Sequence, residues 1–240
     1  MTDRNAPRLF VDAALPGALT LTANQANYLR NVLRKSPGDA ILVFNGQDGE
    51  YAASITSLGK RGGEAHTTDK VRGQTEPLQL TLAFAPLRQA RLDYMMEKAA
   101  EMGARAVVPV LTQHGQVRRI NADRLRANMI EACEQCGTLT VPTLAEPQPL
   151  VAFLASVPRG SLVVADEAIA GAAMDPIEAI RRATPPLSVL VGPEGGFSDK
   201  ERALFGADAI KVSLGPRILR ADTAAVALLA LVEVAHPSVA

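Results

Sequence analysis

From residue 78 onward, the sequence alternates between apolar runs of strand length and amphipathic runs of helix length. LQLTLAF (78–84) and AVVPVL (106–111) are typical of buried strands, and each precedes a helical pattern that ends at a glycine, over 91–103 and 121–137. The alternation continues with a short helix over 150–156, a strand over 161–167, a helix from Asp175, a strand over 187–192, a helix from Ser198, a strand over 209–215 and a last helix from Asp222. This pattern predicts an α/β domain in which helices cover a parallel sheet.

The first 72 residues follow a different pattern, in which short alternating runs are separated by turns. It predicts a small β domain with one helical insertion near 22–34, which either Thr22 or Asn24 can cap. The expected strands cover 18–21, 40–46 and 51–56, followed by a glycine-rich loop over 60–64. RGQTEP (72–77) has glycine and proline but no apolar anchor, so it is the predicted linker. We therefore expect two domains, residues 1–73 and residues 74–240.

The net charge of the chain excludes a global attraction to nucleic acid or membrane, because 25 basic side chains balance 25 acidic ones. Any binding of RNA must therefore be local. The first 35 residues are the basic end of the chain, and their cations are either phosphate contacts or ordinary solvated surface. The candidate RNA-binding residues are Arg8, Arg30, Arg34 and Lys35.

The sequence predicts a cytoplasmic protein without a membrane segment or a metal site. The amino-terminal residues lack the apolar run of a secretion signal, and the apolar stretch 223–235 is too short to span a bilayer and carries Glu233. Cys133 and Cys136 are too few for a disulfide framework, and the histidines show no ligand spacing, so both cysteines are interpreted as structural thiols.

The run LSVLVGPEGGFSDKE (187–201) contains the first loop that is a candidate for ligand binding. A buried type of strand leads into a glycine loop and then into a helix, which a capping box of Ser198 and Glu201 opens. Ligands of parallel α/β sheets bind just beyond the carboxyl ends of the strands, where glycines allow a close approach to the backbone. The loop is therefore either part of a ligand site or a plain tight turn.

A second loop of the same kind, in LGPRILRADTAA (214–225), follows the next strand and leads into a helix that Asp222 or Thr223 can cap. Two such loops at neighbouring strand ends predict a narrow cleft, whose backbone groups can hydrogen-bond an adenine edge and a ribose. A phosphate-binding P-loop is excluded by its missing lysine, and a dinucleotide fingerprint is unfavourable because these loops lie at the carboxyl-terminal end of the chain.

The two loops and several other motifs resemble one known family, the RsmE-type 16S rRNA uridine-N3 methyltransferases of the SPOUT class. In the amino-terminal part, PRLFV (7–11) and NYLRNVLRKSPGDAILVFNG (27–46) are similar to the PUA-like domain of that family. In the remainder, the similar motifs are RLDYMMEKAAEMGARAVVPVLT (91–112), ACEQCG (132–137), LVGPEGGFS (190–198) and LGPRILRADTA (214–224).

The resemblance implies a fold, a cofactor and partners. The fold is an α/β domain with a deep trefoil knot, SPOUT-like, preceded by a small PUA-like β-barrel. The cofactor is S-adenosylmethionine (SAM), held by the knotted loops, and the substrate is 16S rRNA in the small ribosomal subunit. The implied assembly is a homodimer whose interface lies beside the cofactor, which fits the apolar run 225–235, although burial within one subunit explains that run equally well.

Methylation of uracil N3 requires loss of its proton and stabilisation of the resulting negative charge. Arg220 is the predicted anion stabiliser, with a helix-end salt bridge as the alternative. Glu194 is either the proton acceptor or an acceptor of hydrogen bonds from the cofactor or backbone. Asp166 and Glu167 either meet the cofactor or only form a turn. The predicted cofactor-binding residues are Leu190, Gly192, Pro193, Glu194, Gly195, Gly196, Leu214, Gly215, Ile218, Leu219 and Thr223.

The chain departs from the family pattern at three places. Thr112, Gln113, His114 and Gly115 stand where many relatives have TERS-like residues, so an arginine is absent there; Thr138 replaces an arginine, and Asp222 replaces a glutamate. These departures bear on individual RNA contacts. The alternatives that stay open are a non-catalytic RNA-binding relative and a methyltransferase that acts on another RNA nucleotide.

Overall fold

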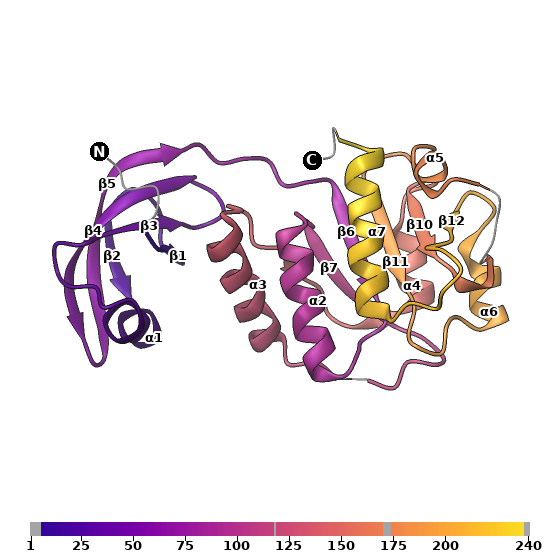
Figure 1. Cartoon of the computed structure of the whole chain (residues 1–240), viewed down its shortest axis with the longest axis horizontal. Coiled ribbons are helices and arrows are strands. Elements are labelled where there is room, and N and C mark those ends of the chain that lie inside the picture. Colours follow the sequence, from indigo (N-terminus) through magenta and orange to yellow (C-terminus); the bar gives the residue numbers. More distant parts are fainter. Residues whose placement is uncertain (1–5, 118, 170–173, 238–240) are drawn as a thin grey trace. The chain divides into compact units, whose positions relative to one another are not determined.

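The structure is a computed structural model that describes residues 6–117, 119–169 and 174–237 (Figure 1). The chain forms two compact units. Unit 1 comprises Met1–Glu76 together with Cys133–Val141, and unit 2 comprises Pro77–Ala132 together with Pro142–Ala240. Each unit is described by itself below.

Unit 1 is built on a five-stranded sheet with the order β1-β3-β4-β5-β2. Strand β1 runs parallel to β3, and all other neighbours are antiparallel. The strands are β1 (Arg8–Phe10), β2 (Ala18–Leu21), β3 (Ala40–Phe44), β4 (Glu50–Gly59) and β5 (Gly62–Arg72). The small β domain is thus confirmed, but β1 was not predicted because its three residues are too few to show alternation.

The predicted glycine-rich loop over 60–64 is wrong, because only Lys60 and Arg61 form the turn and β5 begins at Gly62. The glycines serve close strand contacts instead. A Cβ atom at Gly62 would lie 2.6 Å from the Leu21 carbonyl oxygen, and one at Gly63 would lie 2.5 Å from the Ser57 carbonyl oxygen. The linker prediction also began one residue early, since Arg72 still belongs to β5.

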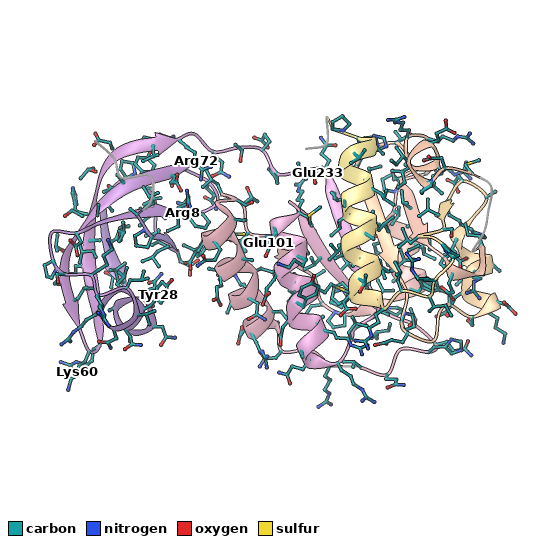
Figure 2. All side chains as sticks on the ribbon, viewed as in Figure 1. Arg8, Tyr28, Lys60, Arg72, Glu101 and Glu233 are labelled. Atoms are coloured by element: carbon teal, nitrogen blue, oxygen red, sulfur yellow. The ribbon has the colours of Figure 1, made fainter. Side chains whose placement is uncertain are left out.

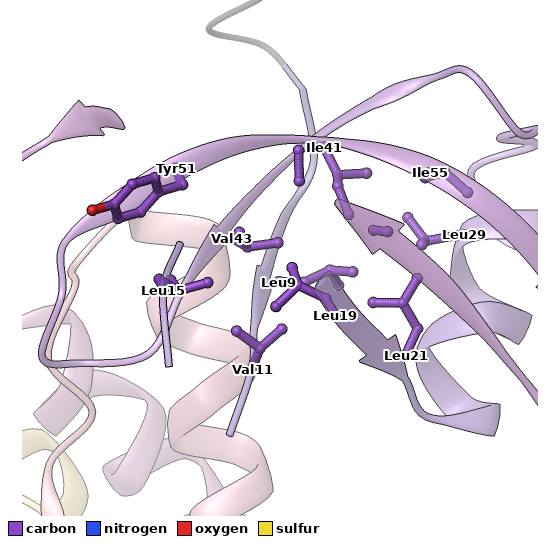
Figure 3. Packing of buried hydrophobic residues seen from close by; sticks show 12 residues of the cluster. Leu9, Val11, Leu15, Leu19, Leu21, Leu29, Ile41, Val43, Tyr51 and Ile55 are labelled. Carbon is purple, nitrogen blue, oxygen red and sulfur yellow. The ribbon is translucent and has the colours of Figure 1, made fainter. Parts of the chain in front are cut away.

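The core of unit 1 collects the inward side chains of these strands (Figure 3). Leu19 and Leu21 alternate with exposed residues along β2, as expected for a strand with one buried face. The cluster also contains Leu9, Val11, Leu29, Ile41, Val43 and Ile55.

The helical insertion of unit 1 begins at Thr22, which caps α1 (Ala23–Asn27) through a capping box with Gln25. Of the two predicted caps, Thr22 is therefore correct and Asn24 is not. The helix continues as a π-helical turn, η1 (Tyr28–Val32), and Arg34 just beyond it has a left-handed backbone with φ of 55°.

Unit 2 is built on a seven-stranded sheet in which all pairs are parallel. Its main order is β12-β10-β11-β6-β7-β8, and β9 also pairs with β7. The strands are β6 (Leu80–Phe84), β7 (Ala106–Leu111), β8 (Thr143–Leu144), β9 (Gln148–Pro149), β10 (Leu162–Ala165), β11 (Leu187–Val191) and β12 (Ile210–Val212). The predicted α/β domain with a parallel sheet is confirmed, whereas the trefoil knot stays a prediction.

Figure 1 shows α2 and α7 side by side in front of this sheet, with α4 behind it. The helices are α2 (Gln89–Glu101), α3 (Ala122–Cys136), α4 (Leu150–Ser156), α5 (Pro176–Ile180), α6 (Asp199–Arg202) and α7 (Ala221–Ala235), with short 3₁₀ turns η2 (Glu167–Ile169) and η3 (Ala203–Phe205). The predicted caps of the last helix, Asp222 and Thr223, are wrong. The N-cap is Arg220, and Asp222 lies in the first turn of α7, where it accepts a hydrogen bond from the Thr223 amide.

The parallel sheet places five loops at one edge, because the carboxyl ends of parallel strands lie together. These loops follow β6, β7, β10, β11 and β12, and they contain both glycine loops of the sequence.

Candidate functional site

A cleft with a volume of about 470 Å³ lies at the carboxyl edge of the sheet in unit 2. This volume is in the range of small-molecule sites. The cleft is formed by the loop after β11 and the loop after β12, with Asp166 and Glu167 at the end of β10. Among the predicted cofactor-binding residues, it is lined by Gly192, Pro193, Glu194, Gly195, Gly196, Leu214, Gly215, Ile218 and Leu219.

The first loop of the cleft, residues 192–198, is anchored by a buried carboxylate. Glu201 is 8% exposed and accepts hydrogen bonds from the amide of Ser198 at 2.8 Å and from its hydroxyl at 2.9 Å. Its other oxygen accepts a bond from the Gln113 amide at 2.7 Å. Glu201 therefore completes the predicted capping box and also ties this loop to the loop after β7.

The hydrogen bonds of Glu201 also set its charge state. Burial alone would raise the pKa of Glu201, but the hydrogen bonds from Ser198 and Gln113 outweigh burial and hold the pKa below its ordinary value. The anchor is thus a carboxylate at neutral pH.

Two glycines of the first loop are required by the space around them. A Cβ atom at Gly192 would lie 2.9 Å from the ring of Phe197, which is buried in the core. Gly196 has a φ of 66°, and a Cβ atom there would overlap the Glu167 carboxylate. The loop is therefore tightly fitted and presents backbone groups to the cleft.

His114 adds a second anchor from the loop after β7. Its Nδ1 atom lies 3.1 Å from the carbonyl oxygens of both Gly195 and Gly196. Both neighbours are acceptors, so Nδ1 carries a proton and donates it. One of the residues that depart from the family pattern thus contacts the candidate cofactor loop directly.

The second loop of the cleft, residues 213–220, is held by far fewer contacts among the described residues. The Gly215 amide donates to the Ser213 hydroxyl at 3.3 Å, and a Cβ atom at Gly215 would meet nothing within 4 Å. Ile218 is 86% exposed, although it is a large aliphatic residue. Ile218 thus contributes an exposed apolar side chain to the lining of the cleft.

The lining of the cleft fits SAM. Glycine-rich backbone is accessible on one wall and can pair with the polar edge of an adenine, and Leu214, Ile218 and Leu219 on the other wall supply apolar surface for its faces. Asp166 and Glu167 add carboxylates at one end of the cleft.

Two of the predicted cofactor-binding residues lie outside the lining of the cleft. Leu190 is fully buried in the core cluster that also contains Phe197 and Phe205. Thr223 is exposed in the first turn of α7.

The two predicted catalytic residues differ in their surroundings. Glu194 lines the cleft and forms an ion pair with Arg91, whose Nη1 atom lies 3.0 Å from Oε1. Arg220 is exposed at the start of α7, next to the cleft residues Leu219 and Ala221, and within the described parts of the chain its guanidinium has no ion pair. The helix-end salt bridge considered for Arg220 is therefore not formed with any residue that the structure describes.

Asp166 and Glu167 are both paired with Arg202 of α6. The Nε atom of Arg202 lies 3.1 Å from Asp166, which is buried, and its Nη2 atom lies 2.8 Å from Glu167. Asp166 also accepts the Ala168 amide at 3.1 Å, as in a strand-end turn. Both carboxylates thus belong to the framework of the cleft.

Arg8, a predicted RNA contact, takes part in an ion-pair cluster of unit 1 (Figure 2). Its Nε atom lies 2.8 Å from the carboxylate of Glu50, which is 1% exposed, and Arg72 binds the same carboxylate at 2.8 Å. Burial would raise the pKa of Glu50, but the hydrogen bonds from Arg72 and Arg8 hold it below its ordinary value. Any phosphate contact of Arg8 is therefore made by a guanidinium that already binds a carboxylate.

Arg30, Arg34 and Lys35 lie at the end of the helical insertion of unit 1. Arg30 and Arg34 are exposed and Lys35 is half-buried. Within the described residues their side chains have no ion pair.

Of the two cysteines, Cys133 has the surroundings of a structural thiol, whereas Cys136 is exposed. Cys133 is buried, and burial raises its pKa to about 12, so it is not a reactive thiolate. In the parts of the chain that the structure describes, no group of three or more histidine, cysteine and acidic side chains is arranged to hold a metal ion. Nor does any described helix have the length and apolarity needed to cross a membrane.

Comparisons with known proteins cover both units. Residues 74–233 match the family model of an RNA methyltransferase domain, and residues 21–66 match that of an RNA methyltransferase PUA domain. "Ribosomal RNA small subunit methyltransferase E" of Rickettsia conorii is 31% identical over 216 residues, which are 87% of this chain and 86% of the relative. The protein of the same name from Synechocystis is 32% identical over 232 residues, or 94% and 74% of the two chains.

Solved structures show the same likeness. A putative methyltransferase from Legionella pneumophila, in complex with the cofactor SAM, has a TM-score of 0.83 and 29% identity, covering 96% of this chain and 98% of that one. A ribosomal RNA small subunit methyltransferase E from Neisseria gonorrhoeae, bound to SAM, has a TM-score of 0.82 and 27% identity with the same coverage.

Proposed function

This chain belongs to the RNA methyltransferase family, and from that premise we propose that it methylates N3 of a uridine in 16S rRNA of the small ribosomal subunit. Its use of SAM and the PUA-like fold of unit 1 follow from the family and its solved structures. The single observation that carries the proposal is the cleft between the loops 192–198 and 213–220, where the family's two motifs form opposite walls.

The two walls of the cleft are proposed to contact different parts of the cofactor. When bound, SAM supplies an electrophilic methyl group on its sulfonium. Backbone groups of Gly192 and Gly195 would hold the polar edge of the cofactor, whereas the Gly196 amide already donates to the Pro193 carbonyl. Leu214 and Ile218 would exclude water from its apolar faces. The remaining predicted contacts, Leu190 and Thr223, lie outside the cleft lining, so any role they have is to support the walls.

Arg220 is the proposed stabiliser of the uracil anion. It lies beside the cleft and has no ion pair within the described residues, so its charge is available for a substrate. Stabilising negative charge on the base favours loss of the N3 proton. Glu194 holds Arg91 through one carboxylate oxygen, Oε1, so we assign Glu194 first to binding and second to proton transfer.

Unit 1 is proposed to bind RNA. Its first segment ends at Glu76, three residues beyond the end of the amino-terminal domain that we propose, residues 1–73. Its best candidates for phosphate contacts are three cations at the end of its helical insertion that have no ion pair among the residues described, Arg30, Arg34 and Lys35. Arg8 is a weaker candidate because it already binds Glu50. We also propose a cytoplasmic location, since the proposed substrate is the small ribosomal subunit.

A homodimer is proposed from the outer face of α7. The inner face of that helix is buried, with Leu228, Leu229 and Val232 each about 1% exposed or less. The outer face contributes Leu231 and Val234 to a second cleft, which Leu214 and Pro216 of the candidate cofactor loop also line. A second copy that covers this face would therefore also contact the cofactor loop.

Mapping of modified nucleosides in small-subunit RNA tests the proposed reaction. Cells that lack this protein should lose N3-methyluridine, and expression of the protein should restore it. Retained N3-methyluridine would contradict the assignment, and loss of another methylated nucleoside would show that the enzyme acts on a different base. Calorimetry with SAM separates the enzyme from a non-catalytic RNA-binding relative, which would give no saturable heat.

A further inference from the structure

Two further clefts lie at the same edge of the sheet in unit 2, and arginines line both. The first has a volume of about 360 Å³ and is lined by Arg88, Arg91 and Gln116, among others. The second, of about 310 Å³, is lined by Arg88, Arg119 and Arg124. Leu87, Arg88 and Val117 belong to both linings, so the clefts adjoin each other, and we call them the arginine clefts.

The arginine clefts are continuous with the cofactor cleft through one residue. Glu194 lines the first arginine cleft and also the cofactor cleft. Its ion pair with Arg91 at 3.0 Å therefore lies at the boundary between the two sites. A strand whose target base enters the cofactor cleft would extend from that boundary along the arginines.

The positive charge of these clefts is only partly compensated. Arg91 is paired with Glu194, and Arg124 is paired with Asp93. Arg88 has no ion pair within the part of the chain that the structure describes, and its side chain donates a 3.4 Å hydrogen bond to the neutral side chain of Gln116. Among the described residues Arg119 is exposed and has no ion pair. The positive charges of Arg88 and Arg119 are thus not balanced by an ion pair within the described residues, although the net charge of the whole chain is zero.

We propose that the arginine clefts bind consecutive phosphates of the rRNA strand next to the target nucleotide, with Arg88 and Arg119 as the principal contacts. Guanidinium groups suit this task because their planar forks bind phosphate oxygens in pairs. The inference rests on the proposed function, since it takes an RNA strand as the substrate of the cofactor cleft. It adds an RNA-binding surface in the catalytic unit to the cations of unit 1.

The test uses the variants Arg88→Gln and Arg119→Gln, singly and together, in the full-length protein. Arg182→Gln is the matched control, because Arg182 is exposed just after α5 and lines neither of the arginine clefts. The probe is small ribosomal subunits from cells that lack the protein. Their affinity is measured over a series of KCl concentrations at constant Mg²⁺, and SAM affinity is measured separately by calorimetry.

Each substitution should weaken subunit binding roughly tenfold and lower the slope of log affinity against log salt by about one, since one phosphate contact is lost. The affinity for SAM and the thermal stability should not change, and the control should behave as wild type. Unchanged subunit affinity in the double variant, or an equal loss in the control, would overturn the inference. Either result would leave the proposed reaction intact if wild-type protein still forms N3-methyluridine, so the two failures can be told apart.

Discussion

The two loops that form the cofactor cleft are held in very different ways. The loop 192–198 is fixed by the buried Glu201, by His114 and by glycines that have no room for a side chain. The loop 213–220 presents an 86% exposed Ile218 and makes few contacts of its own. One wall of the cleft is thus held by contacts within the described chain, whereas the other wall makes few such contacts.

The largest expected effect comes from removing the anchor of the first loop. Glu201→Ala should lower the free energy of unfolding by about 3 kcal/mol, because three hydrogen bonds to a charged group are lost, one of them the reciprocal bond of the capping box. SAM affinity should fall with it. Chemical denaturation and calorimetry measure both, and Asp199→Ala, an exposed acid of the same helix, is the control. Wild-type stability of the Glu201 variant would show that the first loop is not anchored there.

Arg220→Ala should act on turnover and leave the loop intact. Loss of the charge that stabilises the uracil anion should slow single-turnover methylation roughly a hundredfold. SAM affinity and melting temperature should stay close to wild type, because Arg220 is exposed and has no ion pair within the described residues. If methylation is as fast as in wild type, Arg220 has no part in the reaction.

Local sequence motifs predict the two glycine loops, but they do not predict the distant residues that anchor the first loop. Both glycine loops are predictable because each follows a strand pattern and precedes a helical pattern within a few residues. The role of Glu201 was seen only as a cap, since its bond to the Gln113 amide joins positions 88 residues apart. His114 was noted as a departure, and nothing in its local sequence shows that it contacts Gly195 and Gly196.

Contacts between residues that lie far apart in the sequence also explain which parts of the fold were not predicted. Strand β5 begins with two glycines and continues through polar residues, so its local pattern is typical of a loop, and pairing with β2 and β4 decides its structure. The arginine clefts were also missed, because Arg88 and Arg119 come from different loops that only the sheet brings together. The alternation after residue 78, in contrast, is a local pattern and predicted the parallel sheet correctly.

Ile218→Ser tests whether the loop 213–220 contributes to SAM binding without contributing to the stability of the free protein. Because the side chain is exposed in the free protein, stability should change by less than about 0.5 kcal/mol. SAM affinity should fall roughly tenfold, since the cofactor loses an apolar cover. Leu204→Ser, another exposed aliphatic residue that lies outside the cofactor cleft, should leave SAM affinity unchanged. Equal affinity in both variants would mean that Ile218 does not cover the cofactor.

The smallest expected effect is the pH dependence of the first loop. The folded-state pKa of Glu201 lies below its ordinary value of 4.5, so its contribution to stability is complete above that value and is lost as the pH falls through the folded pKa. Wild-type protein should therefore lose stability below about pH 4.5 more steeply than Glu201→Ala in denaturant titrations. Glu50 adds a second such loss that both proteins share. Parallel curves for the two proteins would remove Glu201 as the source.

Hydrogen exchange of the two loops, measured by mass spectrometry with and without SAM, tests the cofactor cleft most directly. Without SAM, peptides that cover 192–198 should exchange more slowly than peptides that cover 213–220. Saturating SAM should slow exchange in both, with the larger gain in 213–220. Protection by SAM at a different place in unit 2, with both loops unchanged, would contradict the assignment of the cleft.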